Sequence, residues 1–247
     1  MIRLFVDAPL AAGADLALPP GAARHAQVRR VQPGDALLLF DGGGCDWPAQ
    51  VLAVGRSEVR VRVAAPQPVA NELPLALTLA LAMPANERMD GLVEQATQLG
   101  AAALQPLLAE RSVLRLSGDR ALRKREHWQA VAEAACEQCG RARVPAIAPV
   151  RPLADWLRSL PPAPAGTRLL LSLAPDALSP AQWQPAAGPL CTLSGPEGGL
   201  TPDEEAAARA AGFQPLSLGP RVLRAETAPL AWLAWLALQH GGGLRHT

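Results

Sequence analysis

From Leu75 onward, short apolar segments that suit buried strands alternate with longer segments that have helical periodicity. Leu75–Leu81 is continuously apolar, Glu87–Leu99 has the pattern of a helix that ends at Gly100, and Ala103–Leu108 is the next apolar segment. Strands of a parallel sheet are covered by helices on both faces, and therefore read as unbroken apolar runs. The alternation predicts an α/β domain built on a parallel sheet.

The same alternation continues through the second half of the chain. Strands are expected at Arg168–Leu173, Leu190–Ser194 and Phe213–Leu218, and helices at Asp119–Cys139, at Pro152–Leu160, after Thr201 and at Glu226–Gln239. Thr201-Pro-Asp-Glu204 carries three signals of a helix start: a threonine cap, a proline at the first position and a glutamate at the third. The final helix is apolar on nearly every face, so we expect it to be buried in the core or at a subunit interface.

The first 65 residues have a different sequence pattern, which is typical of a small β domain. Ala36–Phe40, Val51–Val54 and Val59–Val63 are short strand-like segments separated by turn residues, which favours a small barrel. Ala64–Pro74 contains three prolines and is interpreted as a linker. Two domains are therefore expected, at residues 1–70 and 71–247.

Composition excludes several classes of protein. A chain with 49% hydrophobic and 18% charged residues is too apolar to be disordered. Its net charge of +1 argues against a strongly basic nucleic-acid binder, yet residues 110–143 carry +3 and residues 71–109 carry −3. The longest apolar runs, Leu73–Pro84 and Ala228–Gln239, are too short to span a bilayer. With no signal-peptide pattern at the N-terminus, a cytoplasmic protein without a membrane partner is expected.

Cys136 and Cys139 form a lone Cys-x-x-Cys pair. A structural zinc site needs a second pair of ligands at short spacing, and the sequence has none, so no metal is expected. The pair also falls inside a helical pattern, which makes a packing role the better interpretation.

Two loops at the carboxyl ends of expected strands concentrate the unusual residues. The first is Leu193-Ser-Gly-Pro-Glu-Gly-Gly-Leu200, and the second is Leu218-Gly-Pro-Arg-Val-Leu-Arg-Ala-Glu-Thr-Ala228. Ligands of open α/β sheets bind at this edge, and glycines allow the backbone to approach a ligand closely. Neither loop has the pattern of a nucleotide triphosphate or dinucleotide cradle. Tight turns with a helix cap remain the alternative interpretation.

These two loops closely resemble the paired C-terminal motifs of the RsmE family, SPOUT-class methyltransferases that act on small-subunit ribosomal RNA. The resemblance covers nearly the whole chain, including His25–Asp35, Glu87–Asp90 with Gln95–Gly100, and Ala135–Gln138 with Gly140–Arg143. Two positions depart from the family pattern: Ala85 stands where lysine is usual, and Gln98 stands where an acidic residue is usual.

The resemblance implies an α/β fold with a SPOUT-type trefoil knot in its parallel sheet and a small N-terminal PUA-like β-barrel that helps to bind RNA. It also implies a homodimer that transfers a methyl group from S-adenosyl-L-methionine to N3 of uridine 1498 in 16S ribosomal RNA of the small ribosomal subunit. The implied cofactor-binding residues come from the two loops and the end of an earlier strand: Leu173, Leu193, Ser194, Gly195, Pro196, Glu197, Gly198, Gly199, Leu218, Gly219, Leu223, Arg224, Thr227 and Ala228.

Methylation at uridine N3 requires loss of the N3 proton, which calls for a base or for positive charge near the resulting anion. Arg224 and Arg221 are the candidates for stabilising the anion or a phosphate, because arginine presents a fixed fork of donors. Glu226 is a catalytic candidate, but it is equally suited to be the N-terminal charge of its helix. Glu197 is interpreted as a brace of its loop.

Two clusters of cations are candidates for RNA-backbone contacts. They are Arg120, Arg123, Lys124 and Arg125 in the expected long helix, and Arg24, Arg29 and Arg30 in the N-terminal domain. The alternative for both is a solvated surface. At the level of the whole protein, the alternatives are a SPOUT enzyme with another target, such as a ribose 2′-hydroxyl, and a non-catalytic ribosome-assembly protein.

Overall fold

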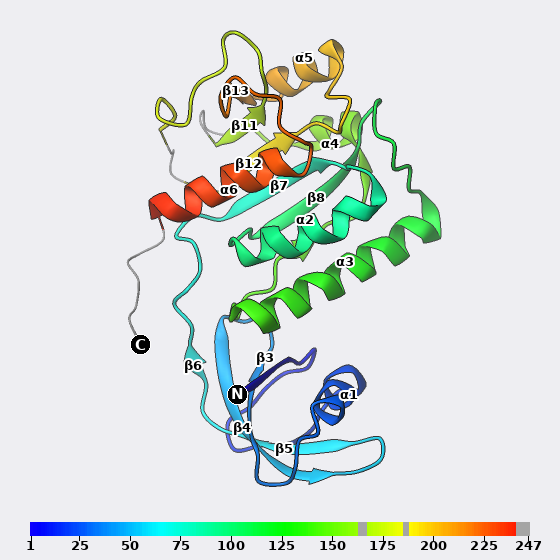
Figure 1. Ribbon diagram of the computed structural model, residues 1–247, viewed down its shortest axis with the longest axis vertical. Coiled ribbons are helices and arrows are strands. Elements are labelled where there is room, and N and C mark those ends of the chain that lie inside the picture. The colour runs from blue at the N-terminus through cyan, green and yellow to red at the C-terminus, as the bar shows by residue number, and fades with distance from the viewer. Residues whose placement is uncertain (163–166, 185–187, 241–247) are drawn as a thin grey trace. The chain divides into compact units, whose positions relative to one another are not determined.

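The computed structural model describes residues 1–162, 167–184 and 188–240 (Figure 1). The chain forms two compact units. The first comprises Met1–Glu72 together with Glu133–Val144, and the second comprises Leu73–Ala132 and the chain from Pro145 onward. The first unit thus includes a segment that is remote in sequence and that no local pattern indicates.

The first unit is built on a sheet with the strand order β1-β3-β4-β5-β2, and β6 pairs with β4. The strands are β1 (Ile2–Phe5), β2 (Asp15–Ala17), β3 (Ala36–Phe40), β4 (Cys45–Val54), β5 (Val59–Val63) and β6 (Gln67–Pro68). β1 runs parallel to β3, and the other pairs are antiparallel. Val59, Val61 and Val63 are buried while Arg60 and Arg62 are exposed, as the alternating sequence predicts. The short strands expected in this region are confirmed.

This unit also contains a helix that was not expected from the sequence, α1 (Pro20–Val28). It begins at a proline, has no side-chain cap, and follows Pro19, so the Pro-Pro-Gly run resembles a turn. Its buried face consists of the small residues Ala22, Ala23 and Ala26, which give a weak helical pattern. The segment Ala64–Pro74, which was expected to be a linker, contains strand β6. This strand pairs with β4 at Cys45 and Asp46.

The second unit contains a parallel sheet with the order β10-β8-β7-β12-β11-β13, and β9 pairs with β8. The strands are β7 (Leu77–Ala82), β8 (Ala103–Leu108), β9 (Ala146–Ile147), β10 (Arg151–Pro152), β11 (Arg168–Leu171), β12 (Leu190–Ser194) and β13 (Gln214–Leu216). Every pairing of these strands in the described residues is parallel. The predicted parallel α/β domain is confirmed.

Five helices of the described chain follow these strands: α2 (Asn86–Gln98), α3 (Gly118–Cys139), α4 (Leu153–Ser159), α5 (Pro202–Ala210) and α6 (Thr227–His240). α2 and α6 lie side by side (Figure 1). α4 packs on α5 and β8, where Trp156 and Phe213 meet Leu170 and Leu193 in one buried cluster. The capping box predicted for α5 is present, because Thr201 Oγ1 accepts from Glu204 N–H and Glu204 Oε2 accepts from Thr201 N–H.

The apolar helix α6 packs against β12. Trp232 is fully buried, and its Nε1 donates to Thr192 Oγ1 at 3.0 Å. Its ring also stacks on Trp235 and meets Trp183 edge to face. On the same helix Leu238 is 84% exposed, so α6 buries only part of its apolar surface within this chain.

We expect Trp232→Phe to lower the free energy of unfolding by about 1–2 kcal/mol, because it removes ring contacts and leaves the buried Thr192 hydroxyl without its donor. Urea unfolding of the full chain measures the change. Substitution of the exposed Gln239 by Ala serves as the control on the same helix. Equal stability of the Trp232 variant and the native protein would contradict this account of the packing.

The cysteine thiols of the helical Cys-x-x-Cys pair differ in burial. Cys136 is fully buried, and burial raises the pKa of its thiol to about 12, while Cys139 is partly exposed. Cys191 is similar to Cys136, with a pKa raised by burial to about 12. All four cysteines of the chain are free thiols.

We expect Cys136 and Cys191 to resist alkylation by iodoacetamide at pH 8. A thiol with a raised pKa is protonated there, with a thiolate fraction on the order of one in ten thousand, and only the thiolate reacts. Peptide mass spectrometry after brief labelling, with and without denaturant, measures this. Labelling of Cys136 at the same rate in both conditions would show that the site is open.

Candidate functional site

The two glycine-containing loops meet at the carboxyl ends of three neighbouring strands. β11 ends at Leu171, β12 at Ser194 and β13 at Leu216, and all three residues border one cavity of about 660 Å³. The remaining lining residues come mostly from the loops that follow these strands: Arg88, Arg111, Ser172, Leu173, Gly195, Pro196, Glu197, Gly198, Gly199, Leu200, Glu205, Leu218, Gly219, Arg221, Val222, Leu223, Arg224, Ala225 and Ala228. The volume lies within the usual range for small-molecule sites.

Backbone crowding shows why the first loop needs its glycines. A Cβ on Gly195 would lie 3.0 Å from Leu200 N and 3.2 Å from Gly199 Cα, and a Cβ on Gly198 would lie 3.3 Å from Arg111 Cβ. Gly199 adopts a φ of +69°, which L side chains rarely adopt. The loop is therefore folded tightly on itself, with its backbone close to the cavity. This is the geometry that a close backbone approach to a ligand requires.

A loop after β8 braces this turn, a contribution that the sequence analysis missed. Arg111 Nη1 donates to Gly198 O at 2.9 Å, and Glu110 N–H donates to Glu204 Oε1 at 2.8 Å. Glu204 therefore serves both the capping box and this neighbouring loop. An arginine three residues after a strand is a weak signal in sequence, because its partner is a backbone oxygen 87 residues away.

Arg221 and Arg224 both line the cavity, as expected for groups that face a ligand. Within the described residues their guanidinium groups make no hydrogen bond or ion pair, whereas those of Arg88 and Arg111 are engaged by the protein. The same cavity is thus bordered by two arginines that bind other groups of the protein and by two that do not, within the described residues. The free pair is available to an anionic ligand.

Glu226 does not line the cavity but binds a residue that does. Its Oε2 accepts from Arg88 Nη1 at 3.2 Å, and the same Nη1 lies 3.7 Å from Glu197 Oε1. Glu197 Oε1 also accepts from Ala85 N–H at 2.9 Å, which places it as a brace between its loop and the start of α2. Arg88 was not among the functional residues predicted from the sequence. It was included only in Glu87–Asp90, one of the segments that resemble the family.

Two of the proposed cofactor-binding residues lie outside the cavity lining. Leu193 is fully buried inside β12, one residue before the strand ends at Ser194. Thr227 begins α6, and its N–H donates to Arg224 O at 2.9 Å. The other twelve proposed residues line the cavity.

The departures from the family pattern leave this geometry in place. Ala85 contributes its backbone N–H to Glu197, a contact that does not depend on the side chain. Gln98 lies at the far end of α2, where its Nε2 donates to Glu94 Oε1 at 3.3 Å.

The candidate RNA-binding residues on α3 lie near its start. Arg120, Arg123 and Arg125 are exposed and Lys124 is partly exposed, while Arg125 Nε donates to Ile147 O at 2.8 Å. Three of the four cations therefore have no hydrogen-bond partner in the part of the chain that the structure describes.

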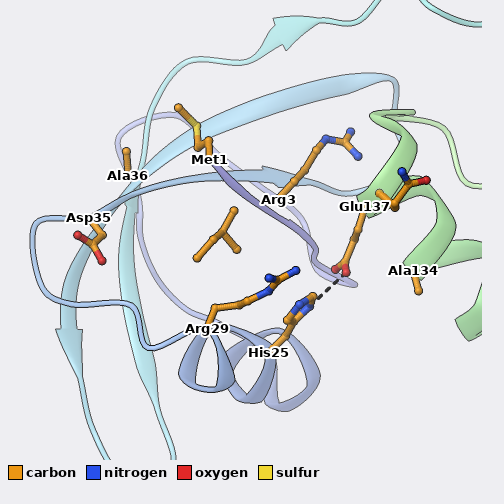
Figure 2. A pocket seen from close by; sticks show the side chains of 10 residues that line it. Met1, Arg3, His25, Arg29, Asp35, Ala36, Ala134 and Glu137 are labelled. Atoms are coloured by element: carbon orange, nitrogen blue, oxygen red, sulfur yellow. Dashed lines mark ion pairs between the residues drawn. The ribbon is translucent and has the colours of Figure 1, made fainter.

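The first unit has a second cavity of about 610 Å³, between α1, β1 and the end of α3 (Figure 2). His25 Nδ1 pairs with Glu137 Oε2 at 3.1 Å, and Arg3 binds Asp46 and stacks on Phe40. The guanidinium of Arg29 faces this cavity, whereas Arg24 and Arg30 are exposed outside its lining.

Two further findings concern metals and membranes. Within the described residues, no three His, Cys, Asp or Glu side chains gather closely enough to hold a metal ion. Of the helices in that same part of the chain, none combines the length and apolarity needed to cross a membrane.

Comparison with known proteins adds a family assignment to this geometry. Residues 71–237 match the RNA methyltransferase domain family, and residues 18–64 match the RNA methyltransferase PUA domain family. A ribosomal RNA small subunit methyltransferase E from Synechocystis is 37% identical over 223 residues, which cover 84% of this chain and 67% of the relative. One from Bacillus subtilis is 29% identical, covering 86% and 85%.

Solved structures are similar along nearly the whole chain. Ribosomal RNA small subunit methyltransferase E from Neisseria gonorrhoeae, bound to S-adenosylmethionine, has a TM-score of 0.89 and 34% identity over 97% of this chain and 98% of its own. A putative methyltransferase from Legionella pneumophila, also in complex with S-adenosylmethionine, has a TM-score of 0.89 and 32% identity over 96% and 97%.

A parallel sheet with a glycine-loop cavity at its carboxyl edge, in a chain that also matches the RNA methyltransferase and PUA domain families, defines an RNA methyltransferase. The predicted α/β class with a PUA-like N-terminal domain is confirmed. The chain belongs to the family of ribosomal RNA small subunit methyltransferase E.

Proposed function

We propose that this protein transfers a methyl group from S-adenosylmethionine to N3 of uridine 1498 in 16S ribosomal RNA. The observation that carries the proposal is the coincidence, in one cavity, of a tight glycine loop and two arginines without partners in the described chain. Similarity to cofactor-bound structures over nearly the whole chain supports the choice of cofactor.

The residues around the cavity fit this cofactor by their chemistry. Gly195, Gly198 and Gly199 keep the loop free of side chains, so that backbone N–H and C=O groups can bind polar groups of a ligand. Leu173, Leu218 and Leu223 give the same cavity an apolar border suited to an adenine ring. We therefore assign cofactor binding to these two loops and the end of β11.

S-adenosylmethionine supplies an electrophilic methyl group when it is bound. The protein must then present uridine N3 without its proton, and the base must be unpaired because N3 lies on the Watson–Crick edge. Arg224 and Arg221 stabilise the negative charge that N3 shares with O2 and O4, since fixed cationic donors act strongly in a sheltered site. Proton loss to water is favoured when the anion is stabilised in this way.

The RNA contacts are proposed on two surfaces, each described within its own unit. Arg120, Arg123 and Lys124 lie near the start of α3, and Arg29 faces the cavity of the N-terminal unit. Arginine and lysine at such positions bind phosphates, largely independently of sequence.

We further propose a trefoil-knotted, dimeric enzyme that acts in the cytoplasm on the small ribosomal subunit. The partly exposed apolar surface of α6, with Leu238 at 84% exposure, supports an interface with a second copy. Sedimentation of the full chain, compared with Leu238→Lys, tests the dimer.

The function is tested by mass spectrometry of 16S rRNA fragments from cells that lack this gene, before and after treatment with the purified protein. The expected result is one additional methyl group on the uracil ring of the target. A methyl group on a ribose would instead favour another SPOUT target. Absence of both methylation and thermal stabilisation by S-adenosylmethionine would favour the non-catalytic alternative.

A further inference from the structure

One guanidinium in the second unit links the two motif loops. Arg88, on the first turn of α2, lies 3.2 Å from Glu226 and 3.7 Å from Glu197. Glu197 belongs to the loop after β12 and Glu226 to the loop before α6, so that Arg88 spans loops separated by about one helix and one strand. The three side chains are only 23–30% exposed.

We propose that Arg88 is a positioning residue that holds both motif loops, and that Glu226 acts as its anchor and not as the proton acceptor for uridine N3. This inference rests on the proposed function, because it assigns roles within the same site. The sequence left two roles open for Glu226, a catalytic group and the N-terminal charge of its helix. The proposal gives it a third role, the anchor of Arg88.

The charges around the cavity support this assignment. Two carboxylates held near each other repel unless a cation lies between them, and Arg88 is the cation that contacts both. The same Nη1 donates to Glu226 and lies within ion-pair distance of Glu197, so a lysine ammonium at this position would keep only part of the attraction to the two carboxylates. Within the described residues neither glutamate pairs with Arg221 or Arg224, so that the guanidinium groups of these two arginines remain for the substrate anion.

The ion pair between Arg88 and Glu226 also affects Arg224, because Glu226 and Arg224 are close in sequence. Glu226 is two residues after Arg224, and the carbonyl of Arg224 accepts the N–H groups of Thr227 and Ala228 at the start of α6. Holding Glu226 therefore holds the backbone that presents Arg224 to the cavity. A misplacement of about 1 Å at a catalytic group can lower a rate roughly 100-fold.

The experiment compares Arg88→Ala, Glu226→Ala and the double variant with the native protein, using methyl transfer into small ribosomal subunits that lack the modification. Each single variant should lower kcat about 10- to 100-fold, with affinity for S-adenosylmethionine changed less. The double variant should lose no more than either single variant, since both remove the same interaction. Arg88→Lys should recover part of the loss.

Glu226→Gln separates an anchor from a proton acceptor. Its amide oxygen still accepts from Arg88, so it should lose less activity than Glu226→Ala. Complete loss in Glu226→Gln, together with native activity in Arg88→Ala, would overturn the proposal. Arg209→Ala is the matched control, because it breaks an exposed ion pair with Asp176 at 2.7 Å in the same unit.

A second readout is independent of activity. Amide hydrogen exchange of peptides spanning residues 195–200 and 219–228 should accelerate in Arg88→Ala and Glu226→Ala, but not in Arg209→Ala. Unchanged exchange in both loops would overturn the positioning role. If exchange accelerates in these two variants but the native protein methylates no RNA, the proposed function fails while the positioning role stands.

Discussion

Arg224→Ala is expected to abolish methyl transfer, with a loss on the order of 1,000-fold in kcat, while affinity for S-adenosylmethionine changes only a few-fold. Arg224 lines the cavity, and its guanidinium makes no hydrogen bond or ion pair within the described residues. Its removal therefore leaves no buried carboxylate unpaired and disturbs no bond that holds the fold. The loss should appear in the chemical step, where positive charge stabilises the uracil anion.

The measurement combines single-turnover methyl transfer with calorimetric titration of S-adenosylmethionine. Arg221→Ala lies in the same loop and removes the second free guanidinium, so its loss relative to Arg224→Ala ranks the two arginines. Native turnover in Arg224→Ala would contradict the assignment. A Kd weakened as much as kcat would instead make Arg224 a cofactor-binding residue.

Much of the fold could be predicted from the sequence because its signals are local. The apolar runs of β7 and β12, and the cap at Thr201, follow from rules that act over a few residues. Helix α1 was missed because its buried face is alanine and its start resembles a turn. Inclusion of Glu133–Val144 in the N-terminal unit depends on contacts such as Phe5 N–H to Glu137, which connect residues 132 positions apart.

The candidate site likewise has some features that could be predicted from the sequence and others that could not. Both glycine loops were located from sequence, because glycine at a tight turn and proline beside it are visible without a structure. Arg88 and Arg111 were missed, since each acts on groups roughly 90 to 140 residues away, and an isolated arginine has no local pattern. Glu226 could be placed next to its helix, but its partner could be found only in three dimensions.

Gly195→Ala is expected to weaken binding of S-adenosylmethionine by about 100-fold while the protein stays folded. The added Cβ would lie 3.0 Å from Leu200 N and 3.2 Å from the backbone of Gly199, and backbone atoms cannot move aside as a flexible side chain can. The loop must therefore shift away from its position at the cavity. A loss of this size corresponds to about 2.8 kcal/mol, since each 1.4 kcal/mol is tenfold in affinity.

Gly91→Ala supplies the matched control for the same chemical change. Gly91 lies inside α2, where a Cβ would meet nothing within 4 Å, so alanine should leave binding intact and raise stability by about 0.5–1 kcal/mol. Calorimetric titration and thermal unfolding of both variants measure the contrast. If Gly195→Ala bound the cofactor as tightly as Gly91→Ala does, the tight loop would not be a part of the binding site, and the cavity's role would rest on its arginines alone.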